Sequence, residues 1–369
     1  MSVNYFFPYF YRYFHIFFKE HAFRKYPSAG RHTEKTFNPG ALKIISYYME
    51  REYADTYEKV LHRLEYLKRK FPGQVVLHLL GRTADGRMIP ELSLGDPDRP
   101  VHILIHAAVH GREYANSAVL LELAGDHLYR AQKETRKNAL REVCFHIIPM
   151  VNPDGVSISQ YGPGAIRDPS LRKGLYDCWK RDRGNFHPPI KEQLYFRRWK
   201  ANARGVDINR NFSAGWKEYA GTLFPSFAGY KGPFPESERE TRALLDSARR
   251  WKPCCCISLH SSGNLIYWDY RSEGRLYDTD KMLARYIGRV TGYKTCSSAD
   301  EGAVRAGCSD YFMETLKIPS VTIETGIGEC PLPPAEYPLL SQNLSRLLPS
   351  LSRLYRRQSK REETFHFRL

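Results

Sequence analysis

Residues 101–120 have the sequence V-H-I-L-I-H-A-A-V-H-G-R-E-Y-A-N-S-A-V-L, and this stretch decides the fold. Its apolar run at 103–109 predicts a buried strand, and residues 117–130 have the spacing of a helix that Asn116 would cap. Between the two lies H-G-R-E at 110–113, with a histidine and a glutamate three residues apart where the strand ends. A pair of this kind at the carboxyl end of a buried strand can hold a metal ion.

The rest of the chain alternates strand-like apolar runs with helical patterns. Further strands are predicted at 75–80, 88–94, 143–150, 254–259, 265–268 and 319–323. Further helices are predicted at 57–71, 235–251, 282–290 and 339–351. The segment 161–203 is basic and rich in glycine, proline and aromatic residues, so we expect a loop there. This alternation predicts an α/β fold with a mixed sheet covered by helices on both faces.

Two more residues, His260 and Glu324, follow directly on predicted strands. Sites in open α/β sheets form beyond the carboxyl ends of strands, so we expect both side chains to lie near His110 and Glu113. His110, Glu113 and His260 would supply two imidazoles and one carboxylate, a set that binds zinc in hydrolases and leaves one position for water. A single histidine at a strand end is more often structural, and only the combination favours a metal site.

The charge and the cysteines limit the function classes. The formal net charge is +16, but residues 1–49 and 350–369 together carry +9 of it, and no zinc-finger or helix-turn-helix pattern occurs, so we expect no nucleic-acid partner. The eight cysteines include three in a row and none with C-x-x-C spacing. We therefore expect buried free thiols in a reducing compartment, with a cytoplasmic location, and no zinc site built on cysteines.

The chain is expected to divide into three parts. Residues 1–48 form a basic, aromatic extension, residues 49–350 a catalytic domain, and residues 351–369 a basic tail. The aromatic run at 5–18 is broken by proline and charged residues and is too short to span a bilayer, so membrane contact is not expected. The chain is expected to be a monomer.

A set of motifs carries a family resemblance. In chain order they are G-R-T-A-D-G-R (81–87), H-G-R-E (110–113), V-N-P-D-G (151–155), G-V-D-I-N-R-N-F (205–212), G-P-F-P-E-S-E (232–238), S-L-H-S (258–261) and T-I-E-T-G (322–326). Over about residues 50–348 the chain resembles the zinc metallocarboxypeptidase family of carboxypeptidase A. W-K-A-N-A-R-G-V-D-I-N resembles most the bacterial branch that cleaves γ-D-glutamyl-diaminopimelate bonds. The resemblance implies one catalytic domain with a mixed, mostly parallel eight-stranded sheet between helices.

The resemblance also implies a role for each strand-end residue. His110, Glu113 and His260 would bind one Zn²⁺ ion per chain, which is the ligand set of carboxypeptidase A itself. Glu324 would be the general base that takes a proton from zinc-activated water and later delivers it to the leaving amine.

Substrate contacts are implied in the same way. Arg112, Asn209 and Arg210 match the family's groups for the terminal carboxylate of the substrate, which a guanidinium can grip with two hydrogen bonds. The position that sets side-chain preference falls at Ser309, beside Asp310, so neither an apolar pocket floor nor a clear acidic one is expected.

Two family positions hold other residues here. Lys200 stands where the family has the arginine that polarises the scissile carbonyl; Lys200 could still take that catalytic role, or Arg198 or Arg204 could reach in. The family's mobile tyrosine falls at Gly302, so a different lid is expected.

The resulting functional hypothesis is a zinc-dependent carboxypeptidase acting on a peptide or muropeptide with a free carboxyl terminus. Several basic residues in 161–203 would suit an acidic muropeptide or would form a solvated surface. Among them are Arg167, Arg172, Lys173, Lys180, Arg181 and Arg183. The alternatives are a zinc amidohydrolase of N-acyl amino acids and an inactive binding protein with the same fold.

Overall fold

The computed structural model describes the backbone of residues 53–133, 143–298 and 306–366. Within these ranges it describes the side chains as far as Arg356. Residues 53–369 form one compact unit. The expected extension at 1–48 and the replacement at Gly302 lie outside the described residues, so the predictions about them stay untested. Within the described part of the chain, no helix has the length and apolar character needed to cross a bilayer.

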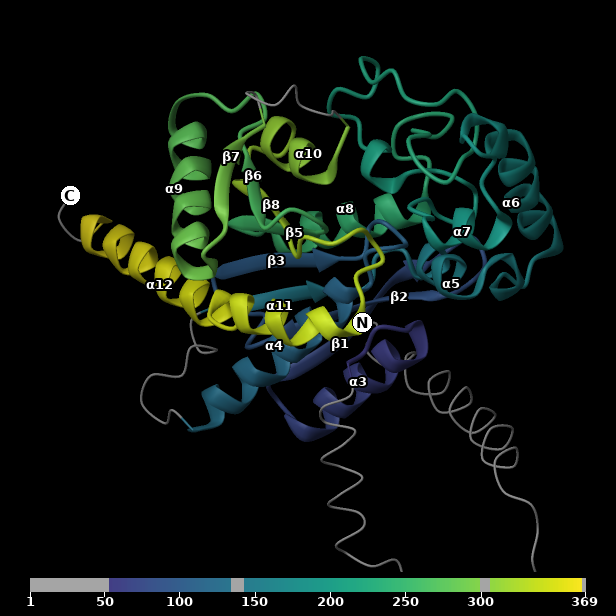
Figure 1. Ribbon diagram of the computed structural model, residues 1–369. Helices are drawn as coiled ribbons and strands as arrows, with labels where there is room; N and C mark the ends of the chain where they lie inside the picture. Colours follow the sequence, from purple (N-terminus) through teal and green to yellow (C-terminus); the bar gives the residue numbers. More distant parts are fainter. Residues whose placement is uncertain (1–52, 134–142, 299–305, 367–369) are drawn as a thin grey trace, which may run out of the picture. The chain divides into compact units, whose positions relative to one another are not determined.

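A mixed eight-stranded sheet crosses this unit in the order β1-β2-β4-β3-β5-β8-β6-β7 (Figure 1). The central strands β4, β3, β5 and β8 run parallel, as do β6 and β7, whereas β1 and β2 are antiparallel and β6 opposes β8. The strand bounds are β1 Val75–Arg82, β2 Met88–Leu94, β3 Val101–Ala107, β4 Val143–Ile148, β5 Cys255–His260, β6 Leu265–Trp268, β7 Lys294–Ser297 and β8 Ser320–Glu324. The predicted α/β class and mixed sheet are confirmed.

Helices cover both faces of the sheet, and each face has its own apolar core. One core contains buried residues of α3 Tyr57–Lys70, α4 Ala115–Lys133, α9 Gly274–Thr291, α11 Tyr337–Leu344 and α12 Leu347–His366. The opposite core contains residues of α8 Arg239–Trp251 and α10 Cys308–Glu314. Strand β3 supplies Ile103 and Ile105 to the first core and Leu104 to the second, because successive side chains point to opposite faces. This double burial explains the continuous apolar run of β3.

Local sequence signals set the helix ends. At α3, the Thr56 side chain accepts a hydrogen bond from the Lys59 amide at 3.2 Å, Glu58 lies in the first turn, and the last turn is basic. Both charge placements favour the helix dipole. Val60, Leu64 and Leu67 recur at helical spacing and are fully buried against the sheet.

The prediction of a loop over 161–203 is wrong. The segment forms α6 Pro169–Asp182 and α7 Glu192–Arg197, with the short 3-10 helices η2 Pro163–Ala165 and η3 Arg183–Asn185, after α5 Pro153–Tyr161. Asp168 caps α6 by accepting from the Ser170 and Leu171 amides, and a proline occupies the first helical position. These helices bury a separate small core around Trp199. The many basic residues of α6 made its helical spacing of buried residues, Leu175, Cys178 and Asp182, hard to recognise in the sequence.

Other element predictions also need correction. Asn116 does not cap α4, because it lies inside that helix and its side chain turns toward the strand ends. The predicted helix 339–351 is two helices, α11 and α12, and α12 continues beyond the predicted helix end at 351, with Tyr355 buried. Pro349 is tolerated in the first turn of α12, where its missing amide hydrogen has no helical partner.

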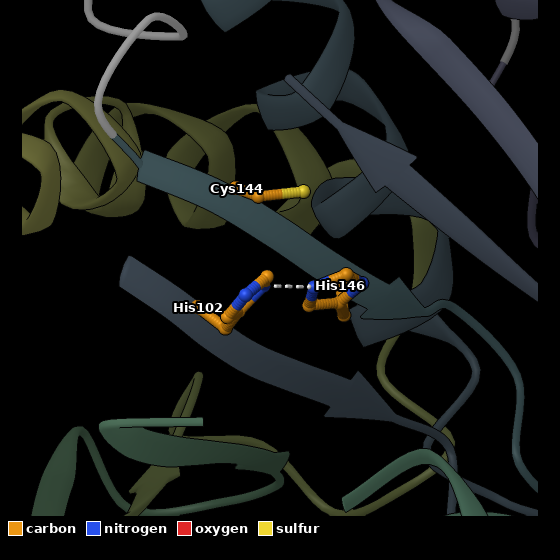
Figure 2. Close-up of side chains that lie close together, drawn as sticks. All are labelled: His102, Cys144 and His146. Carbon is orange, nitrogen blue, oxygen red and sulfur yellow. Dashed lines mark hydrogen bonds between the residues drawn. The ribbon is translucent and has the colours of Figure 1, made fainter. Parts of the chain in front are cut away.

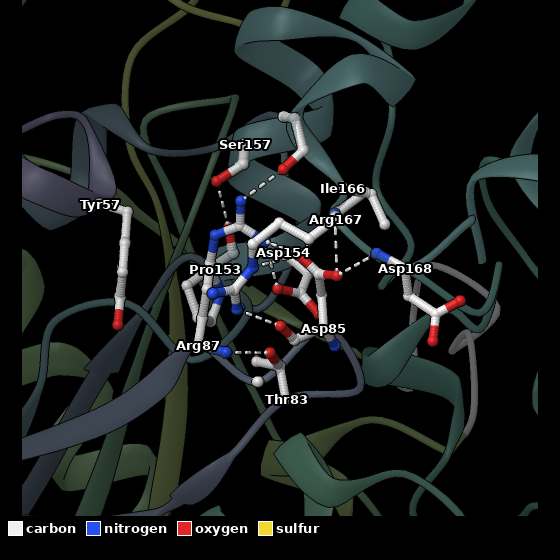
Figure 3. Close-up of polar contacts among 12 residues, drawn as sticks. Tyr57, Thr83, Asp85, Arg87, Pro153, Asp154, Ser157, Ile166, Arg167 and Asp168 are labelled. Carbon is white, nitrogen blue, oxygen red and sulfur yellow. Dashed lines mark hydrogen bonds and ion pairs between the residues drawn. The ribbon is translucent and has the colours of Figure 1, made fainter. Parts of the chain in front are cut away.

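A buried ionic network joins the β1–β2 hairpin to α5 (Figure 3). Arg87 Nη1 lies 2.8 Å from a carboxylate oxygen of Asp85 and 2.8 Å from one of Asp154. Asp85 also accepts from the backbone amides of Arg167 and Asp168, each at 2.9 Å. The motifs G-R-T-A-D-G-R and V-N-P-D-G therefore hold three segments together. Breaking one partner would leave uncompensated buried charge.

Candidate metal centre

The strand-end residues converge as the sequence predicts. β3 and β5 are parallel neighbours, so the turn after β3 and the last residue of β5 lie at the same edge of the sheet. His110 Nδ1 lies 2.8 Å from Glu113 Oε1, and His260 Nδ1 lies 2.9 Å from Glu113 Oε2. The two imidazole rings are 4.8 Å apart between centroids. One carboxylate thus faces two ring nitrogens.

The chemistry of this group fits a zinc ion. The ligand atoms of His110, Glu113 and His260 all lie within 4.8 Å of one another, and all three residues are buried. His110 and His260 each direct Nδ1 at the Glu113 carboxylate. Burial lowers the pKa of His260 to about 4, which leaves its ring neutral and able to offer a lone pair. Burial opposes ionisation of Glu113, but the two histidines outweigh it and hold its pKa well below the usual value.

Asp207 contacts the metal-binding group and was not predicted from the sequence. His110 Nε2 lies 3.2 Å from Asp207 Oδ1, on the side of the ring away from Glu113. Burial would lower the pKa of His110, but Glu113 and then Asp207 outweigh it, so the net shift is upward. The negative charge of Asp207 there favours the tautomer with hydrogen on Nε2, which leaves Nδ1 for the metal. The sequence feature that could have indicated Asp207 is its place in the G-V-D-I-N-R-N-F motif.

Backbone contacts place the H-G-R-E turn. A Cβ atom added at Gly111 would overlap the Gly155 backbone, and one added at Gly155 would overlap the Ala201 carbonyl. The Gly111 amide donates to the Lys200 carbonyl at 2.9 Å. Three motif segments, distant in sequence, therefore touch through their main chains. Only glycine therefore fits at positions 111 and 155 unless the neighbouring backbone moves.

A closed hydrogen-bond triangle supports the ligands from α4. Asn116 donates to Ser261 at 3.0 Å, Ser261 and Thr325 share a bond of 2.9 Å, and Thr325 donates back to Asn116 at 2.7 Å. The Ser261 amide also lies 3.3 Å from Glu113 Oε2. All of these groups are buried, so the triangle ties the ends of β5 and β8 to the glutamate ligand.

Glu324 ends β8 directly beside His260, its partner across the β5–β8 ladder. Burial raises the pKa of Glu324 to about 8, and the nearby Glu113 carboxylate adds to the rise, while His110, Lys200 and Arg210 oppose it. A carboxyl group in this position is suited to holding and releasing a proton.

The three residues expected at the substrate carboxylate lie on two neighbouring segments. Arg112 is in the H-G-R-E turn, and its buried Nε has no hydrogen-bond partner. Arg210 lies with its guanidinium over the Tyr219 ring at 5.4 Å and acts electrostatically on Glu324. Asn209 Oδ1 accepts from the Cys308 amide at 2.9 Å, which anchors the start of α10.

The candidates for the carbonyl-polarising role are in different environments. Arg198 pairs with Glu329 in an exposed ion pair, and Arg204 is exposed. Lys200 is fixed by its main chain beside Gly111, and its positive charge lowers the pKa values of His110, Asp207 and Glu324. Of the three, Lys200 is the cation that acts on the metal-binding group.

The expected specificity position lies on α10. Ser309 is buried, and its hydroxyl shares a hydrogen bond of 2.8 Å with Thr322 on β8. Asp310 accepts from the Gly307 amide at 3.0 Å and caps the same helix. Burial raises the pKa of Asp310 to about 6, while the charge of Arg210 opposes this rise. Both side chains are polar, and both form hydrogen bonds within the chain, so their role in side-chain preference stays a prediction.

The expected basic surface of 161–203 is largely engaged within the chain. Arg167 pairs with Asp85, Arg172 donates to the Ile166 carbonyl, and Lys173 pairs with Asp177. Arg181 pairs with Asp182, and Arg183 lies over the Trp179 ring. These contacts favour a structural role for most of these cations.

An open α/β sheet with a His₂Glu group at its strand ends defines a protein with a three-ligand metal centre. The chain belongs to the zinc carboxypeptidase family, whose sequence model matches residues 60–338. The predictions of this family, of peptide-hydrolase chemistry and of zinc as the cofactor are confirmed at the level of the family.

Related proteins come from both branches that the motifs suggest. The chain is 28% identical to γ-D-glutamyl-L-diamino acid endopeptidase 1 of Lysinibacillus sphaericus, over 71% of this chain and 63% of that protein. It is 27% identical to carboxypeptidase B of Rattus norvegicus, over 58% of this chain and 46% of the relative. The chain thus spans less than two thirds of the length of both relatives.

Solved structures share the fold. Bovine thrombin-activatable fibrinolysis inhibitor, in complex with tick carboxypeptidase inhibitor, aligns with a TM-score of 0.64 and 21% identity, over 85% of this chain and 99% of that one. Carboxypeptidase A from Helicoverpa armigera aligns with a TM-score of 0.60 and 17% identity, over 93% and 85%.

Proposed function

We propose that the protein is a zinc-dependent carboxypeptidase that hydrolyses the last amide bond of a peptide with a free terminal carboxylate. The observation that carries this proposal is the position of Glu324. Its carboxyl group lies beside the His110, Glu113 and His260 group, and the positive charges of Lys200 and Arg210 act on it. A candidate base, a metal-binding group and two cations are thus close enough to act on one another electrostatically.

Zinc, when bound by His110, Glu113 and His260, supplies Lewis acidity that acidifies water and polarises a carbonyl. Glu324 then takes a proton from the attacking water on its carboxylate and returns it to the leaving nitrogen. Lys200, held beside Gly111, offers its ammonium group to the negative charge that develops on the carbonyl oxygen.

Recognition of the substrate's terminal carboxylate falls to Arg210, Arg112 and Asn209. Arg210 is oriented by its contact with the Tyr219 ring and by a hydrogen bond to the Asn209 carbonyl. Arg112 presents a buried Nε that still lacks an acceptor. A planar guanidinium can hold a carboxylate with two parallel bonds, so this placement would fix the bond to be cleaved relative to Glu324.

Within this class we propose γ-D-glutamyl-diaminopimelate peptides as the preferred substrates. The similarity to the Lysinibacillus enzyme supports this subclass, because that relative is named for γ-D-glutamyl-L-diamino acid bonds. The polar pair of Ser309 and Asp310 adds support, because diaminopimelate has a polar side chain with an amine and a carboxylate.

A substrate panel tests the proposal. The full chain, with its metal content measured, is incubated with L-alanyl-γ-D-glutamyl-diaminopimelate, a hippuryl dipeptide and an N-acyl amino acid, and products are read by mass spectrometry. We expect release of diaminopimelate from the first, loss of activity with a chelator, and recovery with Zn²⁺. Preferential cleavage of the N-acyl amino acid would make the protein an amidohydrolase. Bound zinc without cleavage of any substrate would make it a binding protein.

A further inference from the structure

A second group of metal-ligand side chains lies at the other end of the sheet from the His110 site. His102 stands near the start of β3, and Cys144 near the start of β4, whereas His110 follows the end of β3. Ala107 is five positions further along β3 than His102, which corresponds to about 17 Å of extended strand. The group is therefore separate from the catalytic centre.

Strand register brings the three side chains together. β3 and β4 are parallel, with His102 beside Cys144 and Leu104 beside His146. Cys144 and His146 are two residues apart, so both point to the same face of the sheet. His102 Nδ1 lies 2.9 Å from His146 Nε2 (Figure 2). One ring nitrogen of each histidine and the Cys144 sulfur all lie within 4.8 Å of one another.

The surroundings orient His146 as a ligand. Ser93 Oγ lies 2.9 Å from His146 Nδ1, which leaves Nε2 directed at His102. The Trp251 ring stacks on His146 at 4.1 Å between centroids and on His102 at 5.8 Å. Second-shell hydrogen bonds and a packed aromatic wall of this kind fix ring orientation at metal sites.

One member of the group can be reached from solvent, whereas Cys144 and His146 are buried. His102 is only partly buried, which gives a small ion a route from solvent.

We propose that His102, Cys144 and His146 form a second, structural binding site for a thiophilic divalent cation such as Zn²⁺. Two imidazole nitrogens and one thiolate bind the ion, and water completes the tetrahedral set. Binding releases the Cys144 thiol proton to solvent and breaks the direct hydrogen bond between the two histidines, and the proton of that bond moves to the other nitrogen of the same ring. The site joins β3 to β4 and is independent of the proposed peptidase function.

Cobalt provides a selective probe, because the catalytic group contains no sulfur ligand. Metal-free full-length protein is titrated with Co²⁺, and the sulfur-to-cobalt charge-transfer absorption is recorded. We expect this absorption to saturate at one Co²⁺ per chain beyond the catalytic ion, and zinc-loaded protein to contain two Zn²⁺ per chain by mass spectrometry.

Variants assign the signal to these residues. Cys144→Ser and His102→Gln should each abolish the sulfur absorption and reduce the zinc content from two ions to one. His102 is partly exposed, so its variant carries the test if Cys144→Ser does not fold. His78→Gln is the matched control, because His78 also contacts Ser93 and the Trp251 ring but is not a ligand, and it should keep the absorption.

Three results would overturn the proposal. The first is a zinc content of one with no sulfur absorption in the parent protein, which would make the cluster a neutral hydrogen-bond chain. The second is absorption that survives both ligand variants. The third is absorption that disappears in Cys308→Ser instead, which would assign it to the separate His106, Cys256 and Cys308 group.

Discussion

At the scale of single residues, Asp207 shows how a group that does not bind the metal can control it. The residue lies 3.2 Å from the outer nitrogen of His110 and also accepts a bond of 3.0 Å from the Gly229 amide. We predict that Asp207→Asn weakens zinc binding by about 10- to 100-fold without unfolding the chain. Competition with a zinc-binding dye measures the affinity, and circular dichroism provides the control. Unchanged affinity would show that Asp207 does not orient His110.

Glu240 gives a prediction about pH and stability. This buried residue at the start of α8 has its pKa raised to about 8, first by burial and then by Asp154 and Glu238. Between about pH 4.5 and 8 the folded state holds a proton that the unfolded state has lost, so the free energy of unfolding falls as pH rises.

Glu240→Gln removes the contribution of Glu240 to the pH dependence of the unfolding free energy, because glutamine does not titrate. The variant should match the parent near pH 4 and be more stable near pH 8 by roughly 2–4 kcal/mol. Urea unfolding at both values measures the difference. An advantage of the same size at both pH values would show that the effect does not come from titration of Glu240.

At the scale of elements, the contact between the H-G-R-E and V-N-P-D-G turns sets the geometry of the site. Gly111→Ala would force a methyl group into the Gly155 backbone. We predict a loss of about 3 kcal/mol or more in unfolding free energy, or a folded protein with much weaker zinc binding. Gly164→Ala is the control, because an added Cβ there meets nothing within 4 Å. Equal stability of the two variants would contradict the role of this contact.

Strands that are buried on both faces of the sheet were predicted correctly, whereas a helix with few buried residues was not. The apolar runs of β3, β5 and β8 are buried on both faces and could be recognised by composition alone. Helix α6 buries only Leu175, Cys178 and Asp182 within a strongly basic sequence, so its pattern was read as a loop. For α6, the capping residue Asp168 followed by Pro169 indicates a helix start more clearly than composition or charge does.

At the scale of the whole molecule, the sequence could place His110, His260 and Glu324 because parallel strand ends meet at one edge of the sheet. The sequence did not indicate that Asp207 contacts His110, because Asp207 follows no strand and instead precedes the short 3-10 helix at Ile208–Arg210. Nor could it bring His102 to Cys144 and His146, since that contact depends on the register of β3 against β4. Strand pairing over long sequence separations carries this information.

The central claim is that Glu324 acts as the proton-transferring base beside a zinc ion held by His110, Glu113 and His260. Turnover of the preferred substrate by Glu324→Gln, with zinc content measured in the same preparation, tests it most directly. The account predicts that catalytic zinc is retained and that turnover falls by roughly 10²- to 10⁴-fold. Near-normal turnover by the zinc-loaded variant would contradict it.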